Sequence, residues 1–240
     1  MLDTLERFAI PHSIHKVVPF IGELQPEPTP RSDDVICIGS YSMRHYAMKM
    51  GWNPGVFDLE PHDFERQRAH WGAAMLNADS EIVTFANVKF EGERFVRPVD
   101  DTKSFAGNVF EWDEFAVWQQ RVVELGEDIG SSLTGDTWVQ VSVPKLINKE
   151  VRCWIIEGRS VTASMYKVGS RVAYSEQVEP RFVEFAEELA GRWSPEKAFC
   201  LDVCDTPNGL RVVEINTINS AGFYAADMQK LVMALDGLKR

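Results

Sequence analysis

Apolar runs and amphipathic stretches alternate through the first part of the chain. Residues 34–40, "DVICIGS", form a continuous apolar run that ends in Gly-Ser, a pattern that favours a buried parallel strand. The next stretch, 43–51, has helical periodicity and ends at Gly51. A strand, a glycine turn and a helix in this order predict an α/β unit near the N-terminus.

The middle of the chain has the patterns of two helices with two strands between them. The expected elements are a helix over 62–77, strands over 81–85 and 93–99, and a helix over 113–130. In the second of these helices, the apolar residues Phe115, Trp118, Val122 and Leu125 recur at helical spacing. Gly126 or Gly130 is expected to end that helix.

The second half of the chain is richer in strands. The expected strands are 137–143, 150–158, 159–168, 198–206 and 209–216, and the expected helices are 180–193 and 225–238. Glu157-Gly158 and "PNG" at 207–209 have the composition of hairpin turns. This order predicts an α+β body that follows the small α/β part.

Composition and charge narrow the class of protein. The chain has 240 residues, 45% of them hydrophobic, which is ordinary for a globular protein with a core. A net charge of -11 disfavours broad binding of nucleic acids. No apolar run reaches the roughly 18 residues of a membrane-spanning helix, and the N-terminus lacks the pattern of a signal peptide. We therefore expect a cytoplasmic protein that is not inserted in a membrane.

The four cysteines are expected to be buried thiols. Cys37, Cys153, Cys200 and Cys204 show no paired C-x-x-C spacing, and two of them lie within one expected strand. Buried thiols are therefore favoured over metal ligands and over disulfides.

Polar residues interrupt the last expected hairpin, where an apolar strand would be the simpler solution. Asp202 lies on its first strand, close in register to residues 213–214, while Glu214 and Asn216 share one face of its second strand. Three such oxygen ligands suit Mg²⁺ when substrate phosphates complete its coordination. From these residues alone a magnesium site and a set of solvent-facing strand residues both stay open, although the apolar neighbours count against the second.

With the segment "WVQVSVPKLINKEVRCWIIEGRSVTASMY", this hairpin resembles the ATP-grasp superfamily, in particular its glutathione-synthetase-like members. The resemblance covers roughly residues 90–238 and rests on several motifs in the family's order. It implies a metal site at Asp202, Glu214 and Asn216, and an acidic-x-Arg pair at Glu150 and Arg152, with Tyr166 where many members carry another arginine. It also implies contacts to the nucleotide from Glu150 and to adenine from Gln140, Val141 and Ser142.

One segment departs from the family pattern. Members usually have a Lys-Pro strand whose lysine contacts the nucleotide phosphates, whereas this chain has Arg97 before Pro98 and a lysine, Lys103, further on. Arginine can also bind phosphate, so the resemblance implies a small branch with arginine in that place. On this basis Arg97 and Lys103 are the expected phosphate contacts, Gly107 lets the following loop close, and Lys145 reaches the phosphates or adenine.

The resemblance also implies a domain organisation. The fold class is α+β, an ATP-grasp fold of two α+β lobes that grip ATP, preceded by a small α/β pre-ATP-grasp domain. The expected boundaries are 1–88 for the first domain and 89–240 for the second, with a small lobe at about 89–137 and a large lobe at about 138–240. Arg44, at a helix start in the first domain, is a candidate for binding a substrate carboxylate; a surface arginine is an equally good interpretation.

The implied activity is that of an ATP- and Mg²⁺-dependent carboxylate–amine (or thiol) ligase, which activates a carboxylate as an acyl phosphate. Arg152 and Lys103 are the expected catalytic cations, and Asn219 and Ser220, just past the metal ligands, are expected to contact substrate. The expected substrates are small-molecule or peptide carboxylates and amines.

Two other classes of function stay open: a phosphotransferase that uses the same site, and a nucleotide-binding module without turnover. The residues do not identify the acceptor or the oligomeric state.

Overall fold

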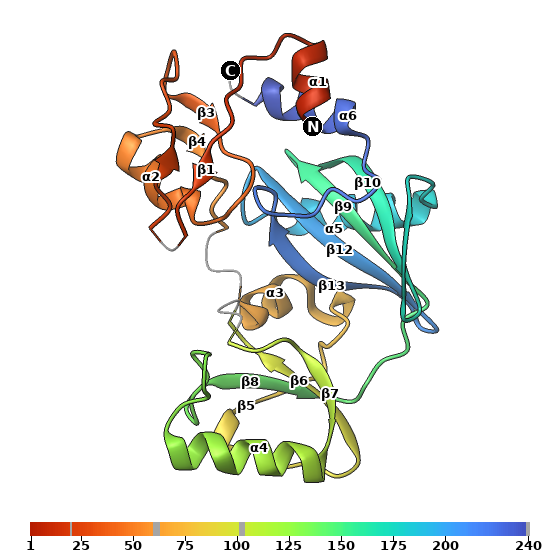
Figure 1. The fold of residues 1–240 in the computed structure, drawn as a ribbon. Coiled ribbons are helices and arrows are strands. Elements are labelled where there is room, and N and C mark those ends of the chain that lie inside the picture. The colour runs from red at the N-terminus through yellow and green to blue at the C-terminus, as the bar shows by residue number, and fades with distance from the viewer. Residues whose placement is uncertain (20, 60–62, 101–103, 239–240) are drawn as a thin grey trace. The chain divides into compact units, whose positions relative to one another are not determined.

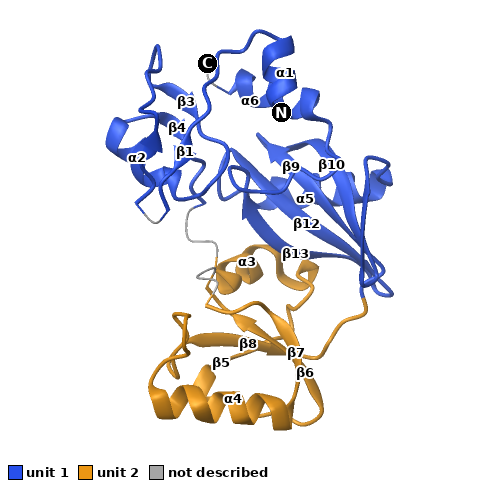
Figure 2. Ribbon diagram, viewed as in Figure 1, with its two compact units in different colours: residues 1–60, 147–240 blue, residues 61–146 orange. Residues whose placement is uncertain are grey.

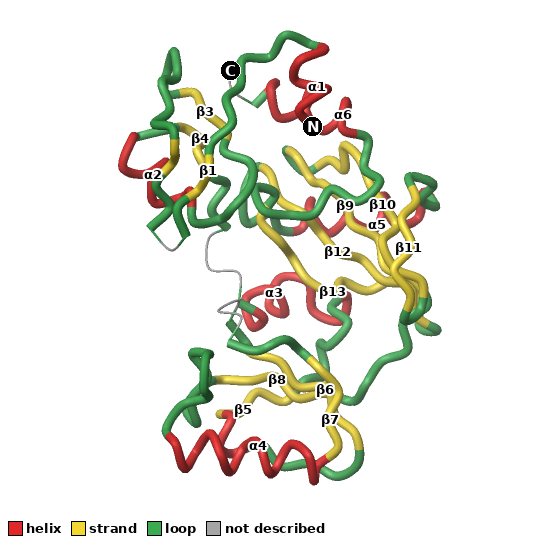
Figure 3. Tube along the Cα trace, in the orientation of Figure 1, coloured by secondary structure: helices red, strands yellow, loops and turns green. Residues whose placement is uncertain are grey.

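The computed structural model describes residues 1–19, 21–59, 63–100 and 104–238. The chain divides into two compact units, one formed by residues 1–60 and 147–240 and the other by residues 61–146 (Figure 2). Each unit contains both helices and strands (Figure 3). The domain boundaries expected from the sequence, 1–88 and 89–240, stay a prediction, since compact units and domains need not coincide.

The first unit is built on a five-stranded antiparallel sheet with the order β11-β10-β9-β12-β13 (Figure 1). Its strands are β9 (Lys149–Ile156), β10 (Arg159–Val168), β11 (Arg171–Ser175), β12 (Ala198–Thr206) and β13 (Gly209–Thr217). The turn between β9 and β10 has positive φ at both Glu157 and Gly158, as a two-residue hairpin turn requires. The two predicted hairpins are therefore confirmed, whereas β11 was not among the predicted strands.

Two helices pack on this sheet. Helix α5 (Pro180–Arg192) contacts β9, β10 and β12, and buries Phe182 and Leu189. Helix α6 (Met228–Gly237) contacts β9 and β10 and adds Leu231 and Leu235 to an apolar cluster around Trp154. Both helices lie where the hydrophobic pattern predicted them.

The N-terminal segment of the first unit forms small elements. These are α1 (Leu2–Arg7), the antiparallel pair β1 (Lys16–Val17) and β2 (Leu24–Gln25), the parallel pair β3 (Asp34–Ile36) and β4 (Asn53–Gly55), and α2 (Met43–Met50). The parallel pairing of β3 confirms the predicted α/β unit, although this strand ends before Gly39. Helix α2 ends at Gly51 in the left-handed conformation, as predicted.

The second unit has a four-stranded sheet with the order β5-β8-β6-β7. Its elements are α3 (Phe64–Trp71), β5 (Glu81–Thr84), β6 (Glu93–Pro98), β7 (Asn108–Glu111), α4 (Trp112–Leu125) and β8 (Trp138–Ser142), with 3₁₀ turns at Gly72–Ala74 and Phe85–Asn87. Helix α4 buries Phe115 and Val122 in an apolar cluster with Val139 of β8. The helix ends at Leu125, which is exposed, and Gly126 caps it in the left-handed conformation, so Gly126 is the one of the two expected glycines that ends it.

Two further sequence predictions can be compared with the structure. All four cysteines are buried free thiols, which confirms the interpretation of their spacing. In the part of the chain that the structure describes, none of the helices combines the length and the hydropathy needed to cross a membrane.

Candidate functional site

A row of four polar residues crosses the large sheet of the first unit. In register, Ser164 of β10 lies beside Arg152 of β9, Arg152 beside Asp202 of β12, and Asp202 beside Glu214 of β13. The predicted pairing of Asp202 with residues 213–214 is therefore confirmed. Cross-strand neighbours share a face of the sheet, so the row brings a cation and two carboxylates together.

The central contact of this row is a bidentate ion pair. Arg152 donates from Nε to Asp202 Oδ1 at 2.8 Å and from Nη2 to Oδ2 at 2.7 Å. The two side chains are 7% and 1% exposed, so each charge depends on the other. Burial raises the pKa of Asp202 to about 6, although Arg152 lowers it. Burial also works against the charge of Arg152, but the hydrogen bonds to Asp202 prevail and raise the pKa of Arg152.

A bulge in β13 shapes the acidic end of the row. The register shifts so that Asp202 faces Glu214 while Val203 faces Val212, which leaves Val213 as the extra residue. Asn216 follows on the same strand, and its amide nitrogen donates to Glu214 Oε1 at 3.0 Å. The three predicted metal ligands therefore lie together on two neighbouring strands.

These three residues fit a magnesium ion by donor chemistry. Because the amide nitrogen of Asn216 points to Glu214, the amide oxygen stays available as a hard donor beside a carboxylate. A carboxylate has about four acceptor sites, so Arg152 does not exhaust those of Asp202. Among the described residues no group of three or more His, Cys, Asp and Glu side chains could hold a metal ion, and the predicted set has a different composition, two carboxylates and a carboxamide.

A second bulge, in β10, adds a tyrosine to the same face. Met165 pairs with Val151 and Lys167 with Glu150, so Tyr166 is the extra residue. Its hydroxyl donates to Glu150 Oε2 at 2.6 Å, and Lys167 Nζ lies 2.7 Å from Glu150 Oε1. Burial, together with the charges of Asp202 and Glu150, raises the pKa of Tyr166, so it is a neutral donor. Lys167 was missed at the sequence level because a bulge leaves no clear signal in the hydrophobic pattern.

Asn219 follows the β12–β13 hairpin and links it to the N-terminal segment. Its amide oxygen accepts from Phe57 N at 2.9 Å, and its amide nitrogen donates to the carbonyl oxygen of Cys37. The side chain is 1% exposed. Both ends of the amide are therefore engaged within the unit, whereas the next residue, Ser220, is exposed. Their predicted contacts to substrate stay predictions.

In the second unit, two predicted nucleotide contacts are neighbours. Arg97 of β6 pairs in register with Gln140 of β8, on the face of the sheet opposite to the apolar cluster with α4. Gln140 is 2% exposed, and its amide oxygen has no hydrogen-bond partner in the described chain. An unpaired buried acceptor costs about 1–3 kcal/mol, a cost that a bound donor would remove.

Gly107 packs against the same face. A Cβ at Gly107 would lie 2.9 Å from Cβ of Arg97 and 2.8 Å from Cζ of Phe95. Glycine is therefore required there by the close approach of the loop to β6. This explains the glycine whether or not the loop closes over phosphates.

The remaining predicted nucleotide contacts have varied surroundings. Val141 belongs to the apolar cluster of the second unit, while Ser142 is buried and its hydroxyl donates to Asn77 Oδ1 at 3.3 Å. Lys145 forms an ion pair of 2.5 Å with Asp79. Lys103 lies outside the described residues.

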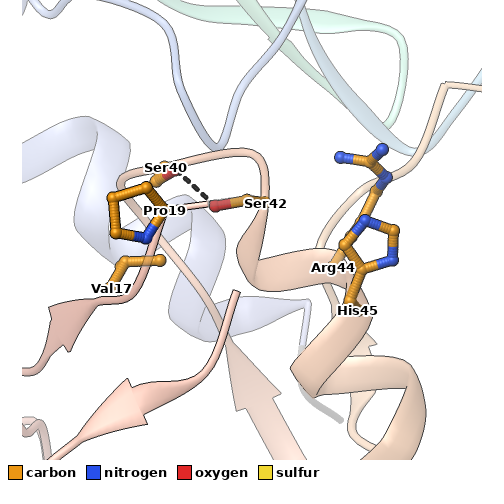
Figure 4. Close-up of a pocket in the computed structure, with 6 residues that line it drawn as sticks. All are labelled: Val17, Pro19, Ser40, Ser42, Arg44 and His45. Carbon is orange, nitrogen blue, oxygen red and sulfur yellow. Dashed lines mark hydrogen bonds between the residues drawn. The ribbon is translucent and has the colours of Figure 1, made fainter. Parts of the chain in front are cut away.

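Arg44 lines a cavity in the first unit, of about 460 Å³ (Figure 4). The cavity is bordered by Val17, Pro19, Ser40, Ser42, Arg44 and His45. Figure 4 shows the hydroxyls of Ser40 and Ser42 joined by a hydrogen bond, with Arg44 and His45 extending from α2. The guanidinium of Arg44 stacks 4.3 Å from the ring centroid of Tyr41.

Comparison with known proteins identifies the family. A family model described as an ATP-grasp domain matches residues 32–235. The chain therefore belongs to the ATP-grasp superfamily, and its fold is the predicted ATP-grasp fold. A small α/β pre-ATP-grasp domain stays a prediction. No curated protein sequence matched the chain.

Solved structures agree on the fold. D-alanine–D-alanine ligase from Coxiella burnetii is 13% identical with a TM-score of 0.56, over 98% of this chain and 77% of that one. D-cycloserine synthetase DcsG is 14% identical with a TM-score of 0.51, over 80% and 73%. A RimK-domain ATP-grasp protein from Sphaerobacter thermophilus is 14% identical with a TM-score of 0.50, over 74% and 66%. Several matched proteins are longer, since this chain spans only 48% to 66% of their length.

Replacing Arg152 by Met should destabilise the first unit by about 3–5 kcal/mol at pH 7, because it leaves the Asp202 carboxylate buried without its cation. The loss should be smaller at pH 5. Without Arg152 the folded pKa of Asp202 lies above its present value of about 6, whereas its unfolded value is 3.8. A carboxyl group whose pKa is raised in the folded state stabilises the fold at pH values below its unfolded-state pKa. This stabilisation is lost as the pH rises through its folded-state pKa.

Urea unfolding followed by tryptophan fluorescence at both pH values measures this difference. The control is the double variant Arg152→Met/Asp202→Asn, which has no carboxylate at this position, so its loss relative to the parent should be smaller than that of the single variant at pH 7 and should not grow as the pH rises from 5 to 7. A single variant with equal losses at the two pH values would contradict the coupling.

Proposed function

We propose that this chain is an ATP- and Mg²⁺-dependent ligase that activates a carboxylate and joins it to an amine or a thiol. The observation that carries the proposal is the polar row on β9, β12 and β13, in which Arg152, Asp202, Glu214 and Asn216 lie together. Burial of such groups in a sheet is costly, and a bound Mg-nucleotide accounts for them. The match to an ATP-grasp family model supports the same class.

The proposed reaction has two steps. First a carboxylate oxygen attacks the γ-phosphorus of ATP, so that a new P–O bond forms, the bond to the leaving oxygen breaks, and ADP departs. An amine then attacks the carbonyl carbon of the acyl phosphate, phosphate leaves, and the amine loses one proton to water. Phosphoryl transfer requires mainly positioning and charge stabilisation, for which this site has cations and oxygen ligands.

In the first unit, Glu214, Asn216 and an oxygen of Asp202 would hold Mg²⁺. Bound Mg²⁺ supplies positive charge that offsets the charge of the phosphates. Arg152 would hold the oxygens of the transferred phosphoryl group, since its pair with Asp202 fixes the guanidinium and the guanidinium stays charged. Glu150 would orient the side chains of Tyr166 and Lys167, both of which contact its carboxylate.

In the second unit, Gln140 is the proposed adenine contact, because its buried amide oxygen can accept from an adenine amino group. Ser142 and the backbone of Val141 complete that proposed contact. Arg97, in register with Gln140, would contact the phosphates. The roles of Lys145 and Gly107, and of Lys103 as a second catalytic cation, rest on the family pattern alone.

The proposed substrates are small molecules or peptides. Arg44 would bind a substrate carboxylate in its cavity of about 460 Å³, where serine hydroxyls and His45 add hydrogen-bonding groups. Ser220, which is exposed and follows Asn216 by four residues, would contact substrate. A contact from Asn219 rests on the sequence-based proposal alone, because its side chain is 1% exposed and its amide is engaged within the unit. The solved structures similar in fold include a ligase of D-alanine and a synthetase of D-cycloserine, both small molecules.

Replacing Glu214 by Gln should lower ADP formation by about 100-fold or more, since a metal ion contributes several kcal/mol of charge stabilisation. The melting temperature should stay within a few degrees of the parent value, because Glu214 is only half-buried. ADP release is measured in a screen of carboxylate and amine pairs, with mass spectrometry of the products.

Glu184→Gln is the matched control, since Glu184 is exposed on α5 and should leave the rate unchanged. Equal ADP formation by Glu214→Gln and the parent would contradict the proposal. ADP release without an acyl-transfer product would favour a phosphotransferase. Calorimetric binding of Mg-ATP without ADP release would favour a binding module.

Replacing Gln140 by Leu should separate stability from nucleotide binding. The variant removes an unpaired buried acceptor, so the free protein should be as stable as the parent or more stable. Loss of the adenine hydrogen bond should weaken Mg-ATP binding by about tenfold. Urea unfolding and titration calorimetry measure the two effects. A variant that is destabilised but binds Mg-ATP normally would show that Gln140 serves the fold and not the nucleotide.

A further inference from the structure

One nitrogen of Arg152 is not used by its ion pair. Nε and Nη2 donate to Asp202, and within the described ranges no hydrogen-bond acceptor is found for Nη1. The guanidinium carbon lies 5.0 Å from the ring centroid of Tyr224 and 5.8 Å from that of Tyr166. Both distances are within the range of a cation–π interaction, so two aromatic rings help to fix the orientation of the arginine.

The loop that carries Tyr224 is built to hold this ring in place. Tyr224 has φ +49°, in the left-handed region that a bulky residue occupies only at a cost in free energy. The backbone that follows Tyr224 is held to β10, because Ala225 N donates to Ser164 Oγ at 3.1 Å and Asp227 N donates to Thr162 Oγ1 at 2.9 Å. Ser164 is the residue beside Arg152 in the polar row, so the loop is anchored next to the arginine.

Tyr224 also belongs to a stack of tyrosines. Its ring lies 5.0 Å from that of Tyr166 and 5.3 Å from that of Tyr174 of β11, each with an interplanar angle of 21°. Tyr224 is 38% exposed and Tyr174 60% exposed, and neither is among the described residues of the apolar clusters around Trp154 and around Trp52. A contribution to the hydrophobic core therefore does not explain why the strained backbone of Tyr224 is kept.

We propose that Tyr224 is a positioning residue for Arg152 in the ligase reaction proposed above, on which this inference rests. Its ring, with that of Tyr166, holds the guanidinium so that Nη1 is directed at an oxygen of the transferred phosphoryl group. The hydrogen bonds from the loop to Ser164 and Thr162 fix the ring before the substrates bind. A preorganised donor of this kind acts mainly on the state in which the phosphoryl group is in transfer.

Two variants separate the ring from the backbone. Tyr224→Phe keeps the ring, and Tyr224→Asn removes it while asparagine tolerates the left-handed conformation. Tyr174→Thr is the control, since it removes a ring that stacks on Tyr224, whereas the rings in cation–π contact with Arg152 are those of Tyr166 and Tyr224. The probes are Mg-ADP alone, and Mg-ADP with aluminium fluoride as a mimic of the phosphoryl group in transfer, both followed by titration calorimetry.

Tyr224→Asn is expected to bind Mg-ADP within about twofold of the parent but to lose about tenfold or more in affinity for the aluminium fluoride complex. Tyr224→Phe and Tyr174→Thr are expected to match the parent with both probes. The inference is overturned if Tyr224→Asn binds both probes like the parent, if it loses both equally, if Tyr224→Phe loses as much as Tyr224→Asn, or if the parent binds Mg-ADP without forming the fluoride complex. A parent that does not bind Mg-ADP would instead refute the proposed function itself.

Discussion

The buried ion pair between Arg152 and Asp202 is the interaction on which the rest of the site depends. It joins the central strand β9 to its neighbour β12, and it places a fixed cation in the same register row as Glu214. Because removal of either charge alone costs a large free energy of folding, the pair fixes how β9 and β12 lie against each other at this point. The bulges at Tyr166 and Val213 then add further polar groups to the same face. The site is thus built on the strands of the sheet, whose rigid backbone fixes the positions of the site's side chains.

The loop after β13 connects this site to the remainder of the first unit. Asn219 uses its whole amide to hold the backbone of Phe57 and Cys37, and a few residues later Tyr224 lies against Arg152. One short segment therefore both anchors the N-terminal elements and borders the guanidinium. Substitutions at Asn219 and at Tyr224 should consequently differ in kind, since the first affects the stability of the unit and the second the orientation of a charged group.

Much of the fold was predictable from the hydrophobic pattern, and the reasons are local. The late hairpin has two largely apolar strands around "PNG", so the turn position placed Asp202 close in register to residues 213–214, whereas the bulge at Val213 that brings Glu214 opposite Asp202 has no signal in the sequence pattern. The sequence offered Gly126 and Gly130 as ends of helix α4, and the periodicity alone could not choose between them; Gly126 is the cap. The contact of Tyr224 with Arg152 was not predictable, since it depends on a left-handed backbone residue and on a bulge, neither of which has a side-chain pattern. The roles of Arg97, Lys145 and Lys103 followed from family resemblance and not from physical signals.

The most direct test of the central claim is an experimental structure of the chain with Mg²⁺ and a non-hydrolysable ATP analogue. The account predicts a metal ion about 2.0–2.1 Å from oxygens of Glu214 and Asn216, with Arg152 still paired to Asp202 and in contact with the phosphates. A nucleotide bound elsewhere, with Glu214 and Asn216 unchanged and no metal beside them, would contradict the account.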